Sequence, residues 1–301
     1  MTLTAFFLII TSATLHATWN LLTKKSKSSV AFYSTASATA TTVWLHTQLW
    51  TPVRLTEMPV NFWLVTLCSV AGDVLYCFGL CRAYRTMEMS IAYPIMRSLP
   101  LLLTVIITSL FGIGTELTIQ AVIGMMIVFA GCMIIPLKKF SDFRPSYYFN
   151  KNMLVLLMVA FGTTGYTLFD SIGQRIMVEN SAGISKTIIS LTYYTTRGFM
   201  LAVALWSYVL SHKTERENFL SFIKQRNWTA FIAGFAAAFT YILVLMAMNY
   251  VSNVSYVQVF RQIGLIIGMS FGIIFLKEKC TAPKVIGVAT ILLGLVLSVI
   301  K

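Results

Sequence analysis

Long runs of apolar residues follow one another along almost the whole chain, and each run is close to twenty residues long. A helix of about 20 apolar residues spans the hydrocarbon core of a bilayer. Ten such runs occur, at 3–22, 30–50, 60–81, 90–111, 118–136, 152–173, 187–210, 228–250, 255–276 and 282–300. They are apolar all round, whereas the strands of a membrane β-barrel alternate apolar and polar residues. The runs therefore predict an all-α integral membrane protein with ten transmembrane helices.

The composition agrees with lipid as the solvent for most of the surface. Hydrophobic residues make up 57% of the 301 residues and charged residues only 11%, whereas soluble domains carry about 25% charged residues. The two longest linkers, 137–151 and 211–227, are too short to build a core of their own. The first run has no charged segment before it and has spanning length, so we expect a helix there and no cleavable signal peptide.

The basic residues are distributed unevenly between the two sides of these runs. Sixteen Lys and Arg lie in the loops after runs one, three, five, seven and nine. The other side holds only four: Arg54, Arg175, Lys186 and Lys301. Because cytoplasmic loops are enriched in Lys and Arg, both termini are predicted to face away from the cytoplasm. The excess of 23 basic over 10 acidic residues then fits anionic lipid rather than nucleic acid, in a multi-pass protein of the inner or plasma membrane.

The two halves of the chain resemble each other. LHATWNLLTKK (15–25) aligns with GYTLFDSIGQR (165–175), and SIAYPIMRSLPLLL in run four aligns with VSYVQVFRQIG in run nine. The matched residues are His16 with Tyr166, Asn20 with Asp170, Arg97 with Arg261, and Gly124 and Gly131 with Gly287 and Gly294. We therefore predict five-helix repeats over residues 1–137 and 152–301. Because five is odd, the second repeat would be inverted, and inverted repeats place a substrate site near the midplane.

Three segments resemble a known family. HATWNLLTKK, YPIMRSLPLLL and FLKEKCTAPKVIGVATILLGLVL resemble the EamA-type family of the drug/metabolite transporter superfamily. The resemblance covers nearly the whole chain, once in each half. It implies a ten-helix carrier for metabolites, with a cavity lined mainly by spans one, three, four, six, eight and nine. The substrate is not implied, because the family handles amino acids, nucleobases, sugars and drugs.

Arg97 and Arg261 are the leading candidates for substrate binding. They occupy matching places in the two halves, too deep in their runs to reach the near surface easily. A guanidinium suits bidentate recognition of a carboxylate, phosphate or phosphonate. The alternative is that each arginine joins helices by binding backbone carbonyls freed near Pro94 and Pro100. Further candidates for the cavity wall are Asn20, Tyr93, Tyr166 and Tyr256.

Asp73, Asp170 and His16 are the candidates for carrying a coupling proton, because ionisable groups inside a bilayer are functional candidates. Each also has a structural alternative. Asp73 could hold an arginine or a hydroxyl of another helix. Asp170, near the end of its run, could pair with Arg175, and His16 could be a hydrogen-bonded packing residue. Arg197 lies inside a run and needs an acidic or carbonyl partner, with Asp73 and Asp170 as the available deep acids.

Motifs of other functions are missing from the sequence. It has no Walker loop, no Gly-rich dinucleotide turn, no HExxH zinc motif and no metal-ligand spacing among its five cysteines. We therefore expect neither an enzyme nor a cofactor nor a metal. The predicted function is secondary transport of a small polar metabolite, such as an amino acid, organic acid or phosphonate. The partners would be this solute and the bilayer, for a monomer or homodimer. The alternatives are a facilitator or exporter of neutral or cationic solutes, or a membrane-embedded enzyme or scaffold.

Overall fold

The regular structure of the described residues is entirely helical. The structure is a computed structural model that describes residues 2–23, 29–87, 89–143, 153–277 and 279–300, without the side chains of 18–23, 89–94, 272, 275 and 276. The helices are α1 (Leu3–Thr23), α2 (Val30–Leu45), α3 (Val60–Thr86), α4 (Met89–Phe111), α5 (Ile119–Ile134), α7 (Met153–Glu179), α8 (Lys186–Ser211), α9 (Lys213–Lys224), α10 (Thr229–Met248), α11 (Ser255–Phe260), α12 (Ile263–Leu276) and α13 (Ala282–Val299). Short 3-10 turns lie at His46–Leu49, Leu55–Glu57 and Phe140–Asp142.

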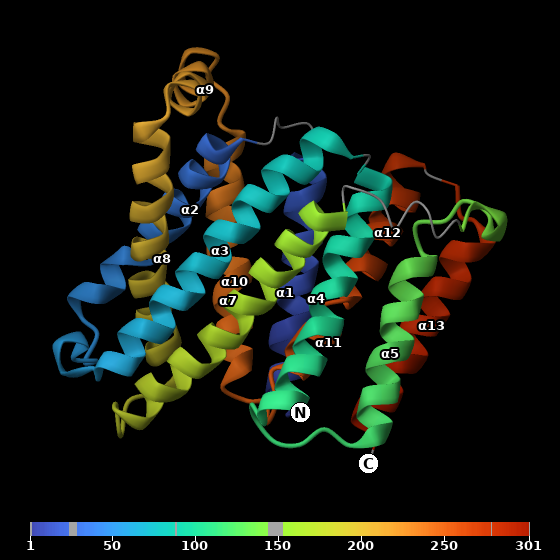
Figure 1. Ribbon diagram of the computed structural model, residues 1–301, viewed down its shortest axis with the longest axis horizontal. Helices are drawn as coiled ribbons and strands as arrows, with labels where there is room; N and C mark the ends of the chain where they lie inside the picture. Colours follow the sequence, from blue (N-terminus) through green and yellow to red (C-terminus); the bar gives the residue numbers. More distant parts are fainter. Residues whose placement is uncertain (1, 24–28, 88, 144–152, 278, 301) are drawn as a thin grey trace.

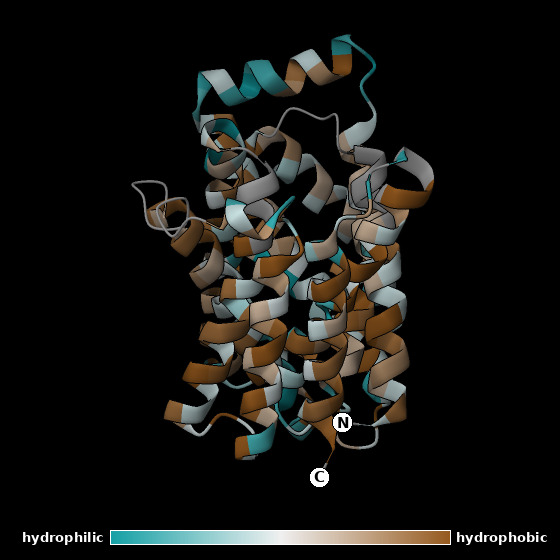
Figure 2. Cartoon of the chain, turned by 90° about the vertical axis from the view of Figure 1, so that its right-hand side faces the viewer, coloured by the Kyte–Doolittle hydropathy of each residue, from teal (hydrophilic) through white to brown (hydrophobic). Residues whose placement is uncertain are grey.

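Five helices are long and apolar enough to cross a membrane: α3, α7, α8, α10 and α13. The helices lie side by side and run between two ends of the molecule (Figure 1). The α9 helix lies across one end, which we call the α9 face, and both chain termini lie at the other, the terminus face (Figure 1). Figure 2 shows hydrophobic residues along the sides of the bundle and hydrophilic residues gathered on the helix that caps the α9 face. The all-helical prediction is confirmed, and the predicted number of spans stays a prediction.

Some boundaries differ from the expected runs. The helix expected at 152–173 continues to Glu179, and the linker 211–227 contains α9. The run 255–276 is interrupted between α11 and α12, at Arg261 and Gln262. At this break the backbone forms tighter bonds, from Gln262 N to Val259 O and from Gly264 N to Arg261 O, both 3.1 Å.

Glycines allow two helix pairs to approach closely. A Cβ added at Gly294 of α13 would lie 2.5 Å from the carbonyl oxygen of Gly124 in α5. Likewise, a Cβ at Gly162 of α7 would lie 2.7 Å from the carbonyl oxygen of Gly72 in α3. Only glycine permits backbones at this separation, as at the small-residue interfaces of membrane helices. These crossings bring α5 against α13 and α3 against α7.

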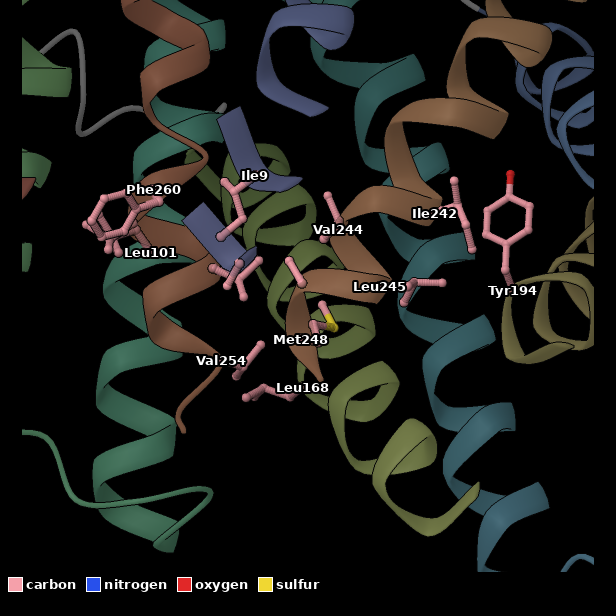
Figure 3. Close-up of a cluster of buried hydrophobic side chains, with 14 of the residues drawn as sticks. Ile9, Leu101, Leu168, Tyr194, Ile242, Val244, Leu245, Met248, Val254 and Phe260 are labelled. Atoms are coloured by element: carbon pink, nitrogen blue, oxygen red, sulfur yellow. The ribbon is translucent and has the colours of Figure 1, made fainter. Parts of the chain in front are cut away.

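The largest apolar core lies between α1, α4, α7, α10 and α11 (Figure 3). Ile9, Leu101, Leu245 and Phe260 are buried members of this cluster from four of these helices, each at most 4% exposed. Tyr194 of α8 belongs to the same cluster and lies beside Ile242 (Figure 3). The core therefore joins helices from both halves of the chain.

Candidate functional site

One cluster of buried polar groups surrounds Arg197 of α8, and we call it the Arg197 cluster. Nη2 of Arg197 lies 2.6 Å from Oδ2 of Asp73 in α3, and Nε of Arg197 lies 3.0 Å from Oδ1 of Asp170 in α7. The Nε also donates to Oγ of Ser69 at 2.9 Å. Arg197 is only 4% exposed. One guanidinium therefore binds carboxylates from two other helices, in the low-dielectric interior where such pairs are strongest.

Asp170 is the most completely hydrogen-bonded acid of this cluster. It is fully buried and accepts from Arg197, from Tyr193 Oη at 2.9 Å, and from the hydroxyls of Ser69 and Tyr241. The expectation that it lies near the end of its span and pairs with Arg175 is wrong. The reason is that α7 continues for nine residues beyond it, to Glu179, which places the carboxylate inside the bundle.

Asp73 has fewer donors than Asp170. Besides Arg197 it contacts Cys77, whose Sγ lies 3.8 Å from Oδ1, and its side chain is 15% exposed. Two carboxylates share one guanidinium here, so with both acids ionised the three groups carry one net negative charge. Asp73 has the more exposed side chain of the two acids.

Two tyrosine rings flank the Arg197 guanidinium. Its central carbon lies 5.6 Å from the ring centre of Tyr166 and 5.5 Å from that of Tyr241. The two rings meet edge to face with centres 5.9 Å apart. Both positions are within the range of a cation–π contact, which adds to the ion pairs. The guanidinium of Arg197 thus contacts two tyrosine rings in addition to its two carboxylates.

A second cluster contains the two arginines that the repeat matches, and we call it the arginine pair. Arg97 Nη2 donates to the backbone oxygen of Arg261 at 3.0 Å, and Gln262 Nε2 donates to the backbone oxygen of Arg97 at 3.1 Å. The Arg261 side chain hydrogen-bonds the Tyr166 side chain, and His16 interacts electrostatically with both arginines. Tyr166 therefore joins the two clusters, with its ring against Arg197 and its polar end towards Arg261.

The arginine pair retains donors that no described group satisfies. Arg97 Nε and Arg261 Nη1 are buried and have no hydrogen-bond partner among the described residues. The ion pairs of the described chain include neither residue. Buried N–H groups are normally paired, and buried charges are normally neutralised. Two guanidinium groups without a carboxylate are an arrangement that an anion would complete.

The structure agrees in part with the alternative role of the arginines, which is to join helices by binding backbone carbonyls. Arg97 does bind a backbone carbonyl, but at the break between α11 and α12 rather than near the prolines of α4. The Pro100 carbonyl accepts instead from the hydroxyls of Thr104 at 2.7 Å and Thr164 at 3.3 Å. Arg97 therefore both ties helices together and leaves one nitrogen open.

Of the remaining candidates for the cavity wall, only Tyr256 has a described side chain, and the contacts of the two clusters do not include it. Tyr256 is half-buried and packs against the apolar core. The expectations for Asn20 and Tyr93 fall on side chains outside the described part of the chain. Of the two wall candidates with described side chains, Tyr166 contacts both arginine sites.

Several polar residues of these clusters were not singled out from the sequence. Gln258 Nε2 donates to Thr167 Oγ1 at 2.9 Å, and Gln262 binds the carbonyls of Gln258 and Arg97. The two glutamines are four residues apart in a mostly apolar run. Residues at this spacing share a face of a helix, so the spacing is the signal by which the sequence could have identified them. Ser69 and Tyr193 carried no comparable signal, because single hydroxyls are common in apolar helices.

Comparisons with known proteins establish the fold and no more. No family model matches the chain, and no curated protein matches it. A solved structure described as "Crystal structure of protein" is similar over 98% of this chain and 95% of its own, with a TM-score of 0.65 and 15% sequence identity. At this identity the similarity concerns the arrangement of helices.

Proposed function

We propose that this chain is a secondary carrier of the EamA type that moves small solutes bearing a carboxylate, phosphate or phosphonate group across the cytoplasmic membrane. The arginine pair carries the proposal. Two guanidinium nitrogens are buried without a partner among the described residues, and a bidentate oxyanion supplies the acceptors they lack. His16 interacts electrostatically with both arginines and Tyr166 interacts with Arg261, so further polar groups accompany the pair in an apolar bundle.

The packing of the helices supports a transporter built from two inverted five-helix repeats. Exchanging the halves replaces α1, α2, α3, α4 and α5 by α7, α8, α10, α11–α12 and α13. Three pairs of contacts correspond under this exchange: α3 with α7 and α10 with α1, α4 with α7 and α12 with α1, and α2 with α10 and α8 with α3.

The contact between α5 and α13 obeys the same exchange. Gly124 faces Gly294 and Gly131 faces Gly287, so these two helices run antiparallel. Gly124 corresponds to Gly287 in the repeat, and Gly131 corresponds to Gly294. Exchanging the halves therefore turns the contact of Gly124 with Gly294 into the contact of Gly287 with Gly131. Antiparallel packing of equivalent helices is the geometry that an inverted repeat requires. Together with the resemblance to EamA-type carriers, this supports alternating access around a central site.

The test is uptake into proteoliposomes of a labelled panel containing a dicarboxylate, a phosphonate, an amino acid, a neutral sugar and an organic cation. We expect uptake of an anionic member, and a loss of at least about tenfold in Arg97→Gln and in Arg261→Gln, because a charge-assisted hydrogen bond contributes about 1.5–3 kcal/mol. Arg54→Gln, an exposed arginine paired with Glu57, is the matched control. Normal anion uptake in both arginine variants would refute the proposal.

The Arg97 contact with a backbone carbonyl favours one second candidate, a facilitator or exporter of neutral or cationic solutes in which the arginines are structural. This function predicts uptake of the sugar or the cation, with no dependence on the guanidinium charge. Arg97→Lys separates the two readings. It keeps the charge but loses the fork geometry, so anion uptake falls less than in Arg97→Gln only if the charge binds solute.

We further propose that Asp73 carries a coupling proton. The Arg197 cluster holds two carboxylates for one guanidinium, and Asp170 has donors from Arg197, Tyr193, Tyr241 and Ser69 that stabilise its charge. Asp73 has fewer donors and the more exposed side chain, at 15% against 0% for Asp170. Asp73→Asn should retain exchange of solute across the membrane but lose accumulation driven by a pH gradient. Unchanged accumulation would assign coupling elsewhere.

A further inference from the structure

A pocket lies at the terminus face, and its lining includes no residue of either arginine cluster. The ends of α4, α7, α8, α10 and α11 surround a pocket of about 160 Å³. Its polar lining residues are Ser171, Gln174, Arg175, Lys186, Asn249 and Ser252. The proposed carrier function uses none of these residues, and we call this pocket the mouth.

The mouth is positively charged and has no acid in its lining. Lys186 is held in place, because its Nζ donates to the backbone oxygen of Asn249 at 3.0 Å and lies 5.1 Å from the ring centre of Tyr250. Arg175 forms no ion pair or hydrogen bond with any described residue, although Glu179 lies one turn further along α7. Two exposed cations therefore line this cavity, and none of its described lining residues is an acid.

Buried polar groups form the floor of the mouth. Asn249 Nδ2 donates to Ser190 Oγ at 2.8 Å and to Gln174 Oε1 at 3.2 Å, while Ser190 Oγ donates to Gln174 Oε1 at 2.9 Å. Gln174 is 1% exposed and its Nε2 also binds the Leu245 carbonyl at 3.1 Å. This network joins α7, α8 and α10, so it closes the mouth towards the interior of the bundle.

We propose that the mouth binds the oxyanion group of the transported solute, through Arg175 and Lys186, before the solute reaches the arginine pair. This inference rests on the proposed carrier function. Pockets for whole drug-sized ligands have about 300–1,000 Å³, and water occupies about 30 Å³ per molecule. A pocket of about 160 Å³ therefore accommodates a carboxylate or phosphate group, with the remainder of a larger solute outside.

The mouth and the arginine pair lie at different levels along α7. Gln174, Asp170 and Tyr166 are spaced four residues apart and so share one face of this helix. Arg175 and Tyr166 are nine residues apart, which corresponds to about 13 Å along a helix. The mouth and the arginine pair are thus two distinct sites, separated by the Gln174 network, and their occupancy can be measured separately.

The experiment uses the purified full-length protein in detergent, with inorganic phosphate as the probe and chloride at equal ionic strength as the reference. The readout is the thermal unfolding midpoint as a function of phosphate concentration, because a ligand of the native state stabilises it. The variants are Arg175→Gln/Lys186→Gln, Arg97→Gln/Arg261→Gln, and all four substitutions together. Arg175→Lys/Lys186→Arg keeps both charges, and Arg54→Gln is the control at the same face.

We expect phosphate stabilisation to persist in Arg97→Gln/Arg261→Gln and to disappear when Arg175→Gln/Lys186→Gln is added. The apparent affinity of the mouth should fall at least about tenfold on losing its cations, as expected for charge-assisted bonds. The charge-retaining variant should bind like the wild type. Equal stabilisation of all variants, or none in the wild type, would overturn the mouth site.

Failure of the carrier function gives a different result. In that case Arg97→Gln and Arg261→Gln take up anions normally in proteoliposomes, or no anion is taken up, whatever phosphate does at the mouth. If phosphate binding depends on Arg175 and Lys186 while uptake does not, the mouth is an anion site but not a step of transport, and the proposal in its present form is refuted.

Discussion

Removing the Arg197 guanidinium tests the Arg197 cluster most directly. Arg197→Met keeps much of the side-chain volume and deletes the charge that binds Asp73 and Asp170 at 2.6 and 3.0 Å. Each pair of unit charges at about 4 Å contributes about 4 kcal/mol at an effective dielectric constant of about 20. The desolvation of the guanidinium opposes this gain, and loss of one partner from a buried pair destabilises proteins by about 3–5 kcal/mol.

The expected loss for Arg197→Met is therefore about 3–5 kcal/mol in the free energy of unfolding. Two carboxylates would remain, one at 0% and one at 15% side-chain exposure, without the cation that neutralises them. The measurement is an SDS titration in mixed micelles followed by far-UV circular dichroism. Adding Asp73→Asn and Asp170→Asn to Arg197→Met should recover more than half of the loss, because the uncompensated charges are then gone.

A matched control exists at the surface. Arg54 Nη1 lies 2.8 Å from Glu57 Oε1, almost the same distance, but the two side chains are 76% and 63% exposed. Exposed pairs contribute at most about 1 kcal/mol, so Arg54→Met should change stability by less than that. If Arg197→Met costs no more than Arg54→Met, burial does not set the strength of the Arg197 cluster and the reasoning is refuted.

Two further variants test the packing of the fold. Gly294→Ala should lower the free energy of unfolding by about 1–3 kcal/mol, because the added Cβ would lie 2.5 Å from the Gly124 carbonyl oxygen. The control in the same SDS titration is Gly268→Ala, whose Cβ would have nothing within 4 Å. Glu215→Ala should weaken the attachment of α9 by about 0.5–2 kcal/mol, because its carboxylate accepts from the Ala31 backbone N–H at 2.9 Å at the start of α2. Limited proteolysis between α8 and α10 should then be faster than in Glu217→Ala, and equal rates would contradict that contact.

The helices could be anticipated because hydropathy is a local property. An apolar run of spanning length favours a helix wherever it lies, so the expected runs and the observed helices agree except near their ends. Arg97 and Arg261 could equally be singled out as candidates, since a charged residue deep in an apolar run is rare and the repeat matched the two. The break at Arg261 and Gln262 was not expected, although Gly264 follows it closely. The carbonyls of Gln258 and Arg261 there accept from the side chains of Gln262 and Arg97, and local hydropathy does not predict such contacts.

The sequence by itself determined that this chain is helical, apolar on its outer surface and interrupted by a few deep charges. Only the tertiary structure decided which charges meet. Arg197 and Asp73 are 124 residues apart, and Arg97 and Arg261 are 164 apart. Contacts between residues so far apart in the sequence depend on which helices cross, for example at Gly72 and Gly162, and not on the local preference for helix. The same crossings left Arg197 with two carboxylates and the arginine pair with none among the described residues, because each charge must find its partner on another helix.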